Sequence, residues 1–208
     1  MVVHSEPRSG AAPAEVPASF RAAVAQLRGA ALRPEVSCEE MPAPQRIAPW
    51  SSALSADVTV ADEEVATGRL ILLHDPDGND AWNGTFRCVA YARADIDPEL
   101  VTDPMLGAVG WSWLVEALSA HGARWGAESG TVTRVASESF GGMSHEEGTA
   151  QLEVRASWTP AEDEDGHLDL APHVEAWGEL LCTAAGLPPV PEGVTAMPSR
   201  RGQRGPGA

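Results

Sequence analysis

Two strand-like segments followed by a helix-like segment occur twice along the chain, and this repetition constrains the fold more than any other feature. An offset of 64 residues aligns Gly84 with Gly148, Trp113 with Trp177 and Gly122 with Gly186. Each repeat contains residues typical of a hairpin and then an amphipathic helix. We therefore expect two ββα-like units side by side on one antiparallel sheet.

The strands of both hairpins are predicted from alternating apolar and polar residues. The first hairpin is expected at residues 68–74 and 85–93, and the second at 131–140 and 149–158. In the last of these strands one face consists of Ala150, Leu152, Val154, Ala156 and Trp158. In the strand at 85–93 the even positions are expected to face the core, while Arg87, Tyr91 and Arg93 face outward.

Three helices complete the expected fold. The first covers residues 17–32 with one apolar stripe, the second begins at the potential cap Asp103 and ends near Gly122, and the third covers 172–186. A short strand is expected at residues 56–60. The sequence thus predicts a single α+β domain at residues 14–189, with a four- to five-stranded antiparallel sheet and helices mainly on one face. We expect residues 1–13 and the Arg/Gly/Pro-rich tail at 190–208 to be disordered.

The net charge of −16 argues against nucleic-acid binding, because such a chain repels phosphate backbones. The tail residues Arg200, Arg201 and Arg204 form a short basic cluster, but no direct nucleic-acid contact is expected from it. Three widely spaced cysteines suggest neither a disulfide framework nor a zinc site. Without a signal-like segment or a run long enough to span a bilayer, the expected location is the cytoplasm and no membrane partner is expected.

Several motifs together resemble one known family. They include Arg46-Ile47-Ala48-Pro49-Trp50 and Gly110-Trp111-Ser112-Trp113-Leu114, together with segments 68–76, 82–87, 103–106, 130–133, 155–160 and 184–189. This set resembles the actinobacterial family catalogued as domain of unknown function number three thousand. The resemblance implies a cytosolic bacterial protein and a gene neighbourhood shared with a ribonuclease-D-like exonuclease, but no activity. The order of elements is also similar to secretion-chaperone-like folds, many of which bind proteins.

No catalytic set emerges from the sequence, and we predict no catalytic residue, metal site or cofactor. The acidic run at residues 75–80 lacks the bidentate Glu of a calcium loop, so a hairpin turn is the better interpretation. His167, Asp169 and His173 match no familiar metal-binding spacing. An enzyme is therefore disfavoured but stays open, because catalytic groups can converge from distant positions.

The candidate binding residues are aromatic and basic. Trp111 and Trp113 project from nearly opposite sides of the second helix, so the sequence leaves open which of them is exposed. Trp111 and Trp82 are candidate interface residues, although both can also be core residues. Arg69, Arg87, Arg93 and Arg155 are expected to form a basic stripe on the outer sheet face, unless Glu138, Glu153 and the acidic loops pair with them.

We therefore expect a non-enzymatic cytosolic binding or adaptor protein that acts through its sheet face or its Trp-bearing helix. Its partner would be another protein or a second copy of the chain. One alternative is an enzyme or small-ligand binder that uses the Arg-lined face. The other is an accessory role in RNA turnover, suggested only by the gene neighbourhood.

Overall fold

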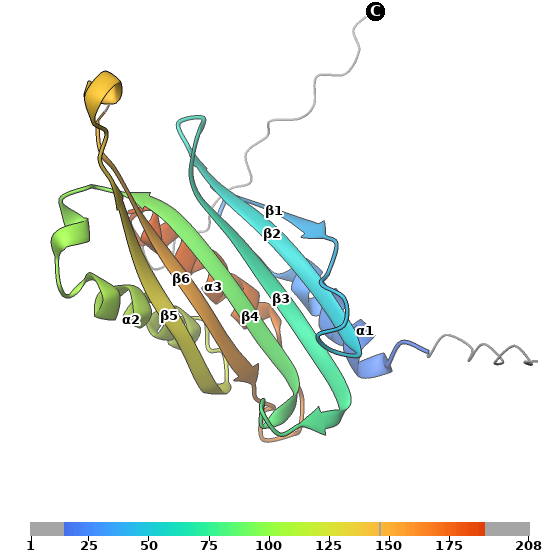
Figure 1. Ribbon diagram of the computed structural model, residues 1–208. Coiled ribbons are helices and arrows are strands. Elements are labelled where there is room, and N and C mark those ends of the chain that lie inside the picture. Colours follow the sequence, from blue (N-terminus) through green and yellow to red (C-terminus); the bar gives the residue numbers. More distant parts are fainter. Residues whose placement is uncertain (1–14, 146, 190–208) are drawn as a thin grey trace, which may run out of the picture.

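A computed structural model describes residues 15–145 and 147–189 (Figure 1). The predicted disorder at 1–13 and 190–208 lies outside these residues. The elements in chain order are α1 (Ala18–Gly29), β1 (Val36–Met41), β2 (Trp50–Val60), β3 (Glu63–Asn79), β4 (Gly84–Ile96), the 3-10 turn η1 (Leu100–Thr102), α2 (Leu106–Ala120), β5 (Trp125–Ser137), η2 (Gly141–Met143), β6 (Thr149–Pro160) and α3 (Ala171–Ala184).

The strands form one six-stranded sheet in the order β1-β2-β3-β4-β6-β5, in which every neighbouring pair is antiparallel. All three α-helices lie on one side of this sheet (Figure 1). The α+β class and the one-sided helical layer confirm the sequence prediction. Because no helix of the described residues covers the second face, its side chains are open to approach along β3, β4 and β6.

The internal repeat is visible in the element boundaries. Shifted by 64 residues, the starts of β3, β4 and α2 fall within two residues of the starts of β5, β6 and α3. The two units meet where β4 pairs with β6. Their helices are exchanged: α2 packs mainly on β5 and β6, whereas α3 packs mainly on β3 and β4. Neither unit buries its own strands alone, and the two units share one hydrophobic core.

The core lies between the sheet and the helices, where the alternation of apolar side chains predicted it. Phe86, Cys88, Ala90 and Ala92 of β4 are all buried, as are the five apolar residues predicted for one face of β6. Trp158 and Trp177 are completely buried. Each indole N–H has an acceptor: Trp158 donates to Nδ1 of His173 at 3.0 Å, and Trp177 donates to the carbonyl oxygen of Tyr91 at 3.2 Å.

The sheet has six strands rather than four or five. The missed strand is β1, whose sequence alternates little and contains two adjacent glutamates, so that only its pairing with β2 defines it. β2 begins at Trp50, well before the predicted residue 56. The acidic run at 75–80 is not itself the turn: β3 continues to Asn79 through an irregular register, and the chain reverses at residues 80–83.

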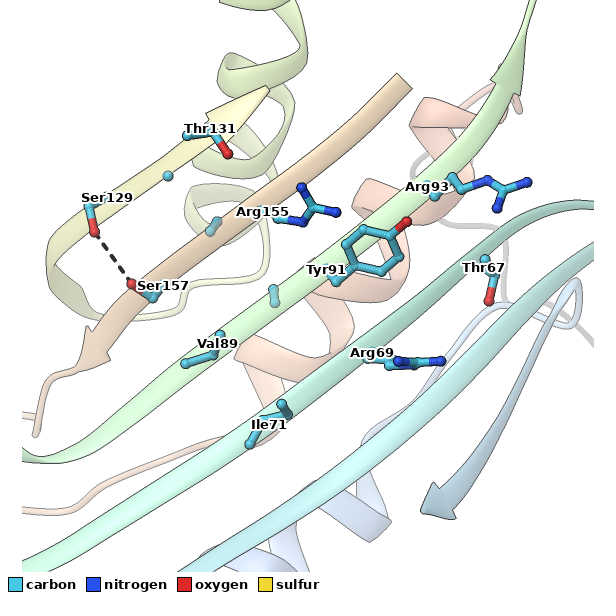
Figure 2. A pocket seen from close by; sticks show the side chains of 13 residues that line it. Thr67, Arg69, Ile71, Val89, Tyr91, Arg93, Ser129, Thr131, Arg155 and Ser157 are labelled. Carbon is cyan, nitrogen blue, oxygen red and sulfur yellow. Dashed lines mark hydrogen bonds between the residues drawn. The ribbon is translucent and has the colours of Figure 1, made fainter. Parts of the chain in front are cut away.

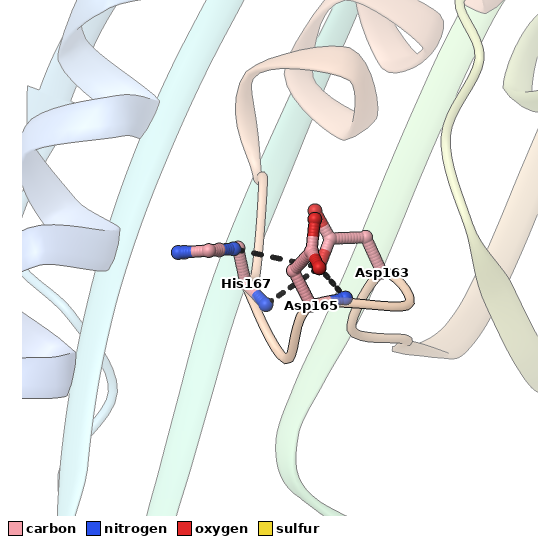
Figure 3. A group of neighbouring side chains, drawn as sticks. All are labelled: Asp163, Asp165 and His167. Carbon is pink, nitrogen blue, oxygen red and sulfur yellow. Dashed lines mark hydrogen bonds and ion pairs between the residues drawn. The ribbon is translucent and has the colours of Figure 1, made fainter.

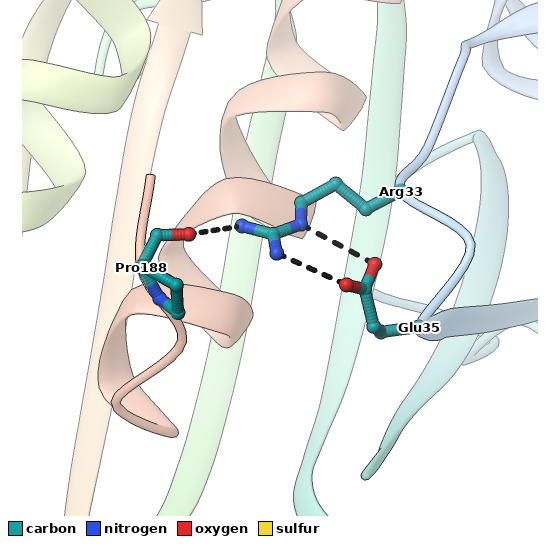
Figure 4. Close-up of polar contacts among 3 residues, drawn as sticks. All are labelled: Arg33, Glu35 and Pro188. Carbon is teal, nitrogen blue, oxygen red and sulfur yellow. Dashed lines mark hydrogen bonds and ion pairs between the residues drawn. The ribbon is translucent and has the colours of Figure 1, made fainter. Parts of the chain in front are cut away.

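The helix boundaries also differ from the prediction. α2 begins at Leu106, and Asp103 accepts a hydrogen bond from the Met105 amide in the turn before it rather than capping the helix. α1 ends at Gly29, short of Arg33. Arg33 instead binds the carboxylate of Glu35 and donates to the carbonyl oxygen of Pro188 at 2.9 Å (Figure 4). This contact ties the segment after α1 to the segment after α3.

In the described part of the chain no helix combines the length and the apolar character needed to cross a membrane.

Candidate functional site

A row of basic and aromatic side chains crosses the open face of the sheet. The strand register places Arg69 of β3 beside Tyr91 of β4, Tyr91 beside Arg155 of β6, and Arg155 beside Thr131 of β5. Residues directly opposite on neighbouring strands lie about 5 Å apart and project from the same face. Of the predicted stripe, Arg69, Arg93 and Arg155 therefore lie on this face, with Tyr91 between Arg69 and Arg155.

These residues line a hollow of about 740 Å³ in the open face (Figure 2). The lining also includes Thr67, Arg93, Ser129 and Ser157, with Ile71 and Val89 as its apolar part. The hollow spans β3, β4, β6 and β5, and the right-handed twist of such a sheet makes its uncovered face concave along one diagonal. The arrangement offers cationic, hydroxyl and aromatic groups to one ligand.

Glu153 of β6 contacts two of the residues that line the hollow. Its carboxylate binds the Arg155 guanidinium at 2.8 Å and accepts a hydrogen bond from the Tyr91 hydroxyl at 3.2 Å. The guanidinium carbon of Arg155 lies 5.3 Å from the centre of the Tyr91 ring, within cation–π range. Burial and the nearby Glu153 raise the pKa of Tyr91, so its hydroxyl stays a hydrogen-bond donor at neutral pH.

Arg69 and Arg93 form no ion pair with a described carboxylate, although Glu153 is opposite Arg93 in the strand register. Within the described residues, neither guanidinium forms an ion pair or a hydrogen bond with another side chain. The alternative weighed from the sequence, pairing of the whole stripe with Glu138 and Glu153, therefore applies only to Arg155. Two cations remain available at the edge of the hollow.

Arg87 differs from its prediction as an outward, accessible stripe residue. It projects from the outer face but is only 7% exposed, because β5 and β6 enclose it. Its guanidinium donates to the carbonyl oxygen of Ala127 at 2.8 Å and to the hydroxyl oxygens of Thr159 at 2.9 Å and Ser157 at 2.7 Å. Burial lowers the pKa of Arg87, and no carboxylate in the described part balances its charge.

Neither Trp82 nor Trp111 lines the hollow. Trp82 lies half-buried in the turn after β3, where its carbonyl oxygen accepts a hydrogen bond from Thr159. Trp111 and Trp113 are both partly buried and packed against the core, so neither of the two is the fully exposed one. Trp111 faces Gly130 so closely that a Cβ atom added there would lie 2.6 Å from its ring. Its contacts hold α2 against β5.

The residues weighed as metal ligands are not brought together as the sequence suggested. His173 is buried against Trp158, away from His167. The exposed group that does converge is Asp163, Asp165 and His167 (Figure 3). One oxygen of Asp163 accepts hydrogen bonds from the amides of Asp165 and His167, so a loop turn explains the arrangement.

Tyr91, Ser129, Ser157 and Glu153 were not predicted as binding residues, whereas Arg93 was predicted as part of the basic stripe. The outward positions of β4 indicated Tyr91 and Arg93. Ser129 lies before the predicted start of its strand. It follows a register shift between Gly126 and Ser129 that no residue pattern predicted. The convergence therefore depends on strand order and register.

The comparisons with known proteins agree with the resemblance seen in the sequence. A family model described as "Protein of unknown function (DUF3000)" matches residues 16–195. The chain belongs to this family. No curated protein and no solved structure matches. The family match covers every strand of the sheet and thus all residues of the hollow.

Proposed function

We propose that this protein is a non-enzymatic binding protein that holds an acidic segment of a partner protein on the open face of its sheet. The binding residues are Arg69 and Arg93, assisted by Arg155 and Tyr91. We place it in the cytoplasm.

The observation that supports this proposal is the presence of two unpaired arginines beside a hollow in a chain of net charge −16. With thirty acidic residues against fourteen basic ones, carboxylates are abundant, yet Arg69 and Arg93 pair with none in the described part. A guanidinium can bind a carboxylate through two parallel hydrogen bonds. The acidic remainder of the surface would repel an anion elsewhere and direct it to this face.

The shape of the hollow favours an extended segment. It crosses four strands and places cations at Arg69, Arg93 and Arg155 on three of them, so a ligand must be long to meet all three. Ile71 and Val89 offer apolar area to side chains between its charges. Tyr91 can additionally stack on a planar group.

A small anionic ligand, bound or chemically transformed, is the second candidate. The volume of about 740 Å³ lies within the usual range for small-molecule sites, which supports this alternative. A role in RNA turnover would be indirect on either account, because a chain of charge −16 should not bind RNA.

The test is a calorimetric titration with a synthetic Asp/Glu-rich peptide and with its Asn/Gln counterpart. We expect the acidic peptide to bind and the neutral one not to. The double variant Arg69→Gln/Arg93→Gln should weaken binding about tenfold or more, since each lost charged hydrogen bond contributes more than 1 kcal/mol. The control Arg21→Gln/Arg124→Gln makes the same change in net charge on the helical side and in the loop before β5. Equal losses in both double variants would contradict the proposal.

A further inference from the structure

A buried positive charge lies behind one end of the hollow. Arg87 is 7% exposed, and the acceptors around its guanidinium are neutral: two carbonyl oxygens and three hydroxyl oxygens. A buried cation usually has an anionic partner, because leaving water costs free energy that neutral acceptors only partly return. An anion near this end of the hollow would provide that balance.

Two serines connect Arg87 to the hollow. Ser157 and Ser129 both line the cavity, and both hydroxyl oxygens accept from the same guanidinium nitrogen, at 2.7 Å and 3.4 Å. The two hydroxyls face each other at 3.4 Å, as Figure 2 shows. Only one of the two hydroxyl protons can be donated in the hydrogen bond between Ser129 and Ser157. The other proton is therefore available to a ligand in the hollow.

Further donors lie on the same side of the hollow. Thr131 and Arg155 are directly paired, one residue pair along the same face from Ser129 and Ser157. Figure 2 shows the Arg155 guanidinium between Thr131 and Tyr91. Three hydroxyl groups and a guanidinium thus surround one end of the hollow, and the charge of Arg87 lies behind them.

We propose that Ser129, Ser157, Thr131 and Arg155, backed by Arg87, form a subsite for a phosphate monoester carried by the ligand. The number of donors favours phosphate over carboxylate: a phosphate monoester presents three terminal oxygens and a charge near −2, whereas a carboxylate presents two oxygens and one charge. The inference rests on the proposed function only in placing the ligand in the same hollow. Arg87 acts as a positioning residue, since Ser129 and Ser157 separate it from the ligand.

The experiment compares four probes by calorimetry: inorganic phosphate, N-acetyl-O-phosphoserine, a phosphoserine-containing acidic peptide and the same peptide with unmodified serine. The wild-type protein should bind the phosphopeptide more tightly than the unmodified one. The double variant Ser129→Ala/Ser157→Ala should weaken binding of every phosphate-bearing probe at least about fivefold and leave the unmodified peptide unchanged. The control Ser112→Ala/Ser119→Ala removes two hydroxyls from α2, on the opposite side of the sheet.

Two results would overturn the subsite: equal affinity of the wild-type protein for the two peptides, or unchanged phosphate binding in Ser129→Ala/Ser157→Ala. The source of the phosphate follows from the same data. A phosphoserine derivative that binds as tightly as the phosphopeptide identifies a small ligand, whereas a clear advantage of the phosphopeptide identifies a protein segment. Failure of the proposed function can be told apart from failure of the subsite. In that case the unmodified acidic peptide would bind Arg69→Gln/Arg93→Gln as tightly as it binds the wild-type protein.

Discussion

Tyr91 and Arg155 are direct neighbours between β4 and β6, and they are also each other's counterparts in the 64-residue repeat. Because β4 and β6 are antiparallel, this pair lies where a pseudo-two-fold axis through the sheet exchanges the two units. Thr67 and Thr131, on opposite sides of the hollow, are counterparts as well. The hollow is therefore centred on the junction of the repeat, where both units contribute side chains to one surface.

Glu153 should act against anion binding, because its carboxylate pairs with Arg155 at 2.8 Å and places a negative charge beside the hollow. We expect Glu153→Gln to increase affinity for an acidic peptide about threefold to tenfold, by freeing Arg155 and removing repulsion. Calorimetry measures the change. Glu116→Gln on α2 removes an equal charge on the other side of the sheet and should have little effect. A weaker complex for Glu153→Gln would mean that Glu153 positions Arg155 rather than competing for it.

Arg87 should be needed for stability. The Arg87 guanidinium donates hydrogen bonds to the carbonyl oxygens of Ala127 and Ser157. Arg87→Met removes this donor, so both carbonyl oxygens lose a hydrogen bond. We expect a loss of about 2–3 kcal/mol in the free energy of unfolding, measured in denaturant. The side chain of Arg93 forms no hydrogen bond with the described residues, so Arg93→Met should change stability by about 0.5 kcal/mol or less. Similar losses in both variants would refute this account of Arg87.

The fold could be predicted where local pattern and packing agree. The strict alternation in β6 and the repeat spacing indicated two hairpins and two helices, and the structure has them. β1 could not be predicted, since its apolar–polar alternation covers only four residues before two adjacent glutamates, and its pairing with β2 defines it as a strand. The end of α1 was placed too late because the sequence offered Pro34 as a stop, while the chain leaves the helix at Gly29.

The binding face could be predicted only in part. Outward positions on β4 identified Arg87 and Tyr91 from alternation alone, but alternation does not report burial by a neighbouring strand. The bulge in β5 between Gly126 and Ser129 brings Ala127 and Ser129 over Arg87, and it depends on a positive φ of 51° at Ala127. A positive φ at a non-glycine residue such as Ala127 cannot be predicted from the residue type.

Gly130 should tolerate no side chain. An added Cβ would lie 2.3 Å from the carbonyl oxygen of Arg155 and 2.6 Å from the Trp111 ring. We expect Gly130→Ala to lower the free energy of unfolding by about 1–3 kcal/mol, through displacement of α2 from β5. Gly107→Ala is the matched control: nothing lies within 4 Å of its Cβ, so the better helix former should be neutral or stabilising. Thermal unfolding of both variants checks this, and a neutral Gly130→Ala would contradict it.

His173 should make stability depend on pH. Burial lowers its pKa to about 4, although the charge of Asp169 acts in the opposite direction. Between about pH 6.5 and pH 4, His173 binds a proton more readily in the unfolded chain than in the folded one. The stabilisation of the fold by neutral His173 is therefore fully present above about pH 6.5 and is lost as the pH falls toward 4. The full shift corresponds to about 3 kcal/mol.

The check is the difference in unfolding free energy between wild type and His173→Gln from pH 7.5 to pH 5. Other groups titrate in both proteins, so only the difference reports His173. We expect the wild-type advantage to shrink steadily as the pH falls. Parallel pH profiles would show that His173 does not titrate differently in the folded and unfolded states.

The most direct test of the central claim is an NMR titration of the isotope-labelled protein with an Asp/Glu-rich peptide, read from backbone amide and arginine side-chain shifts. We expect the largest changes at Arg69, Tyr91, Arg93 and Arg155, and we expect Arg69→Gln/Arg93→Gln to remove them. Changes centred on Trp82 or on Trp111 and α2, with the open face unaffected, would contradict it.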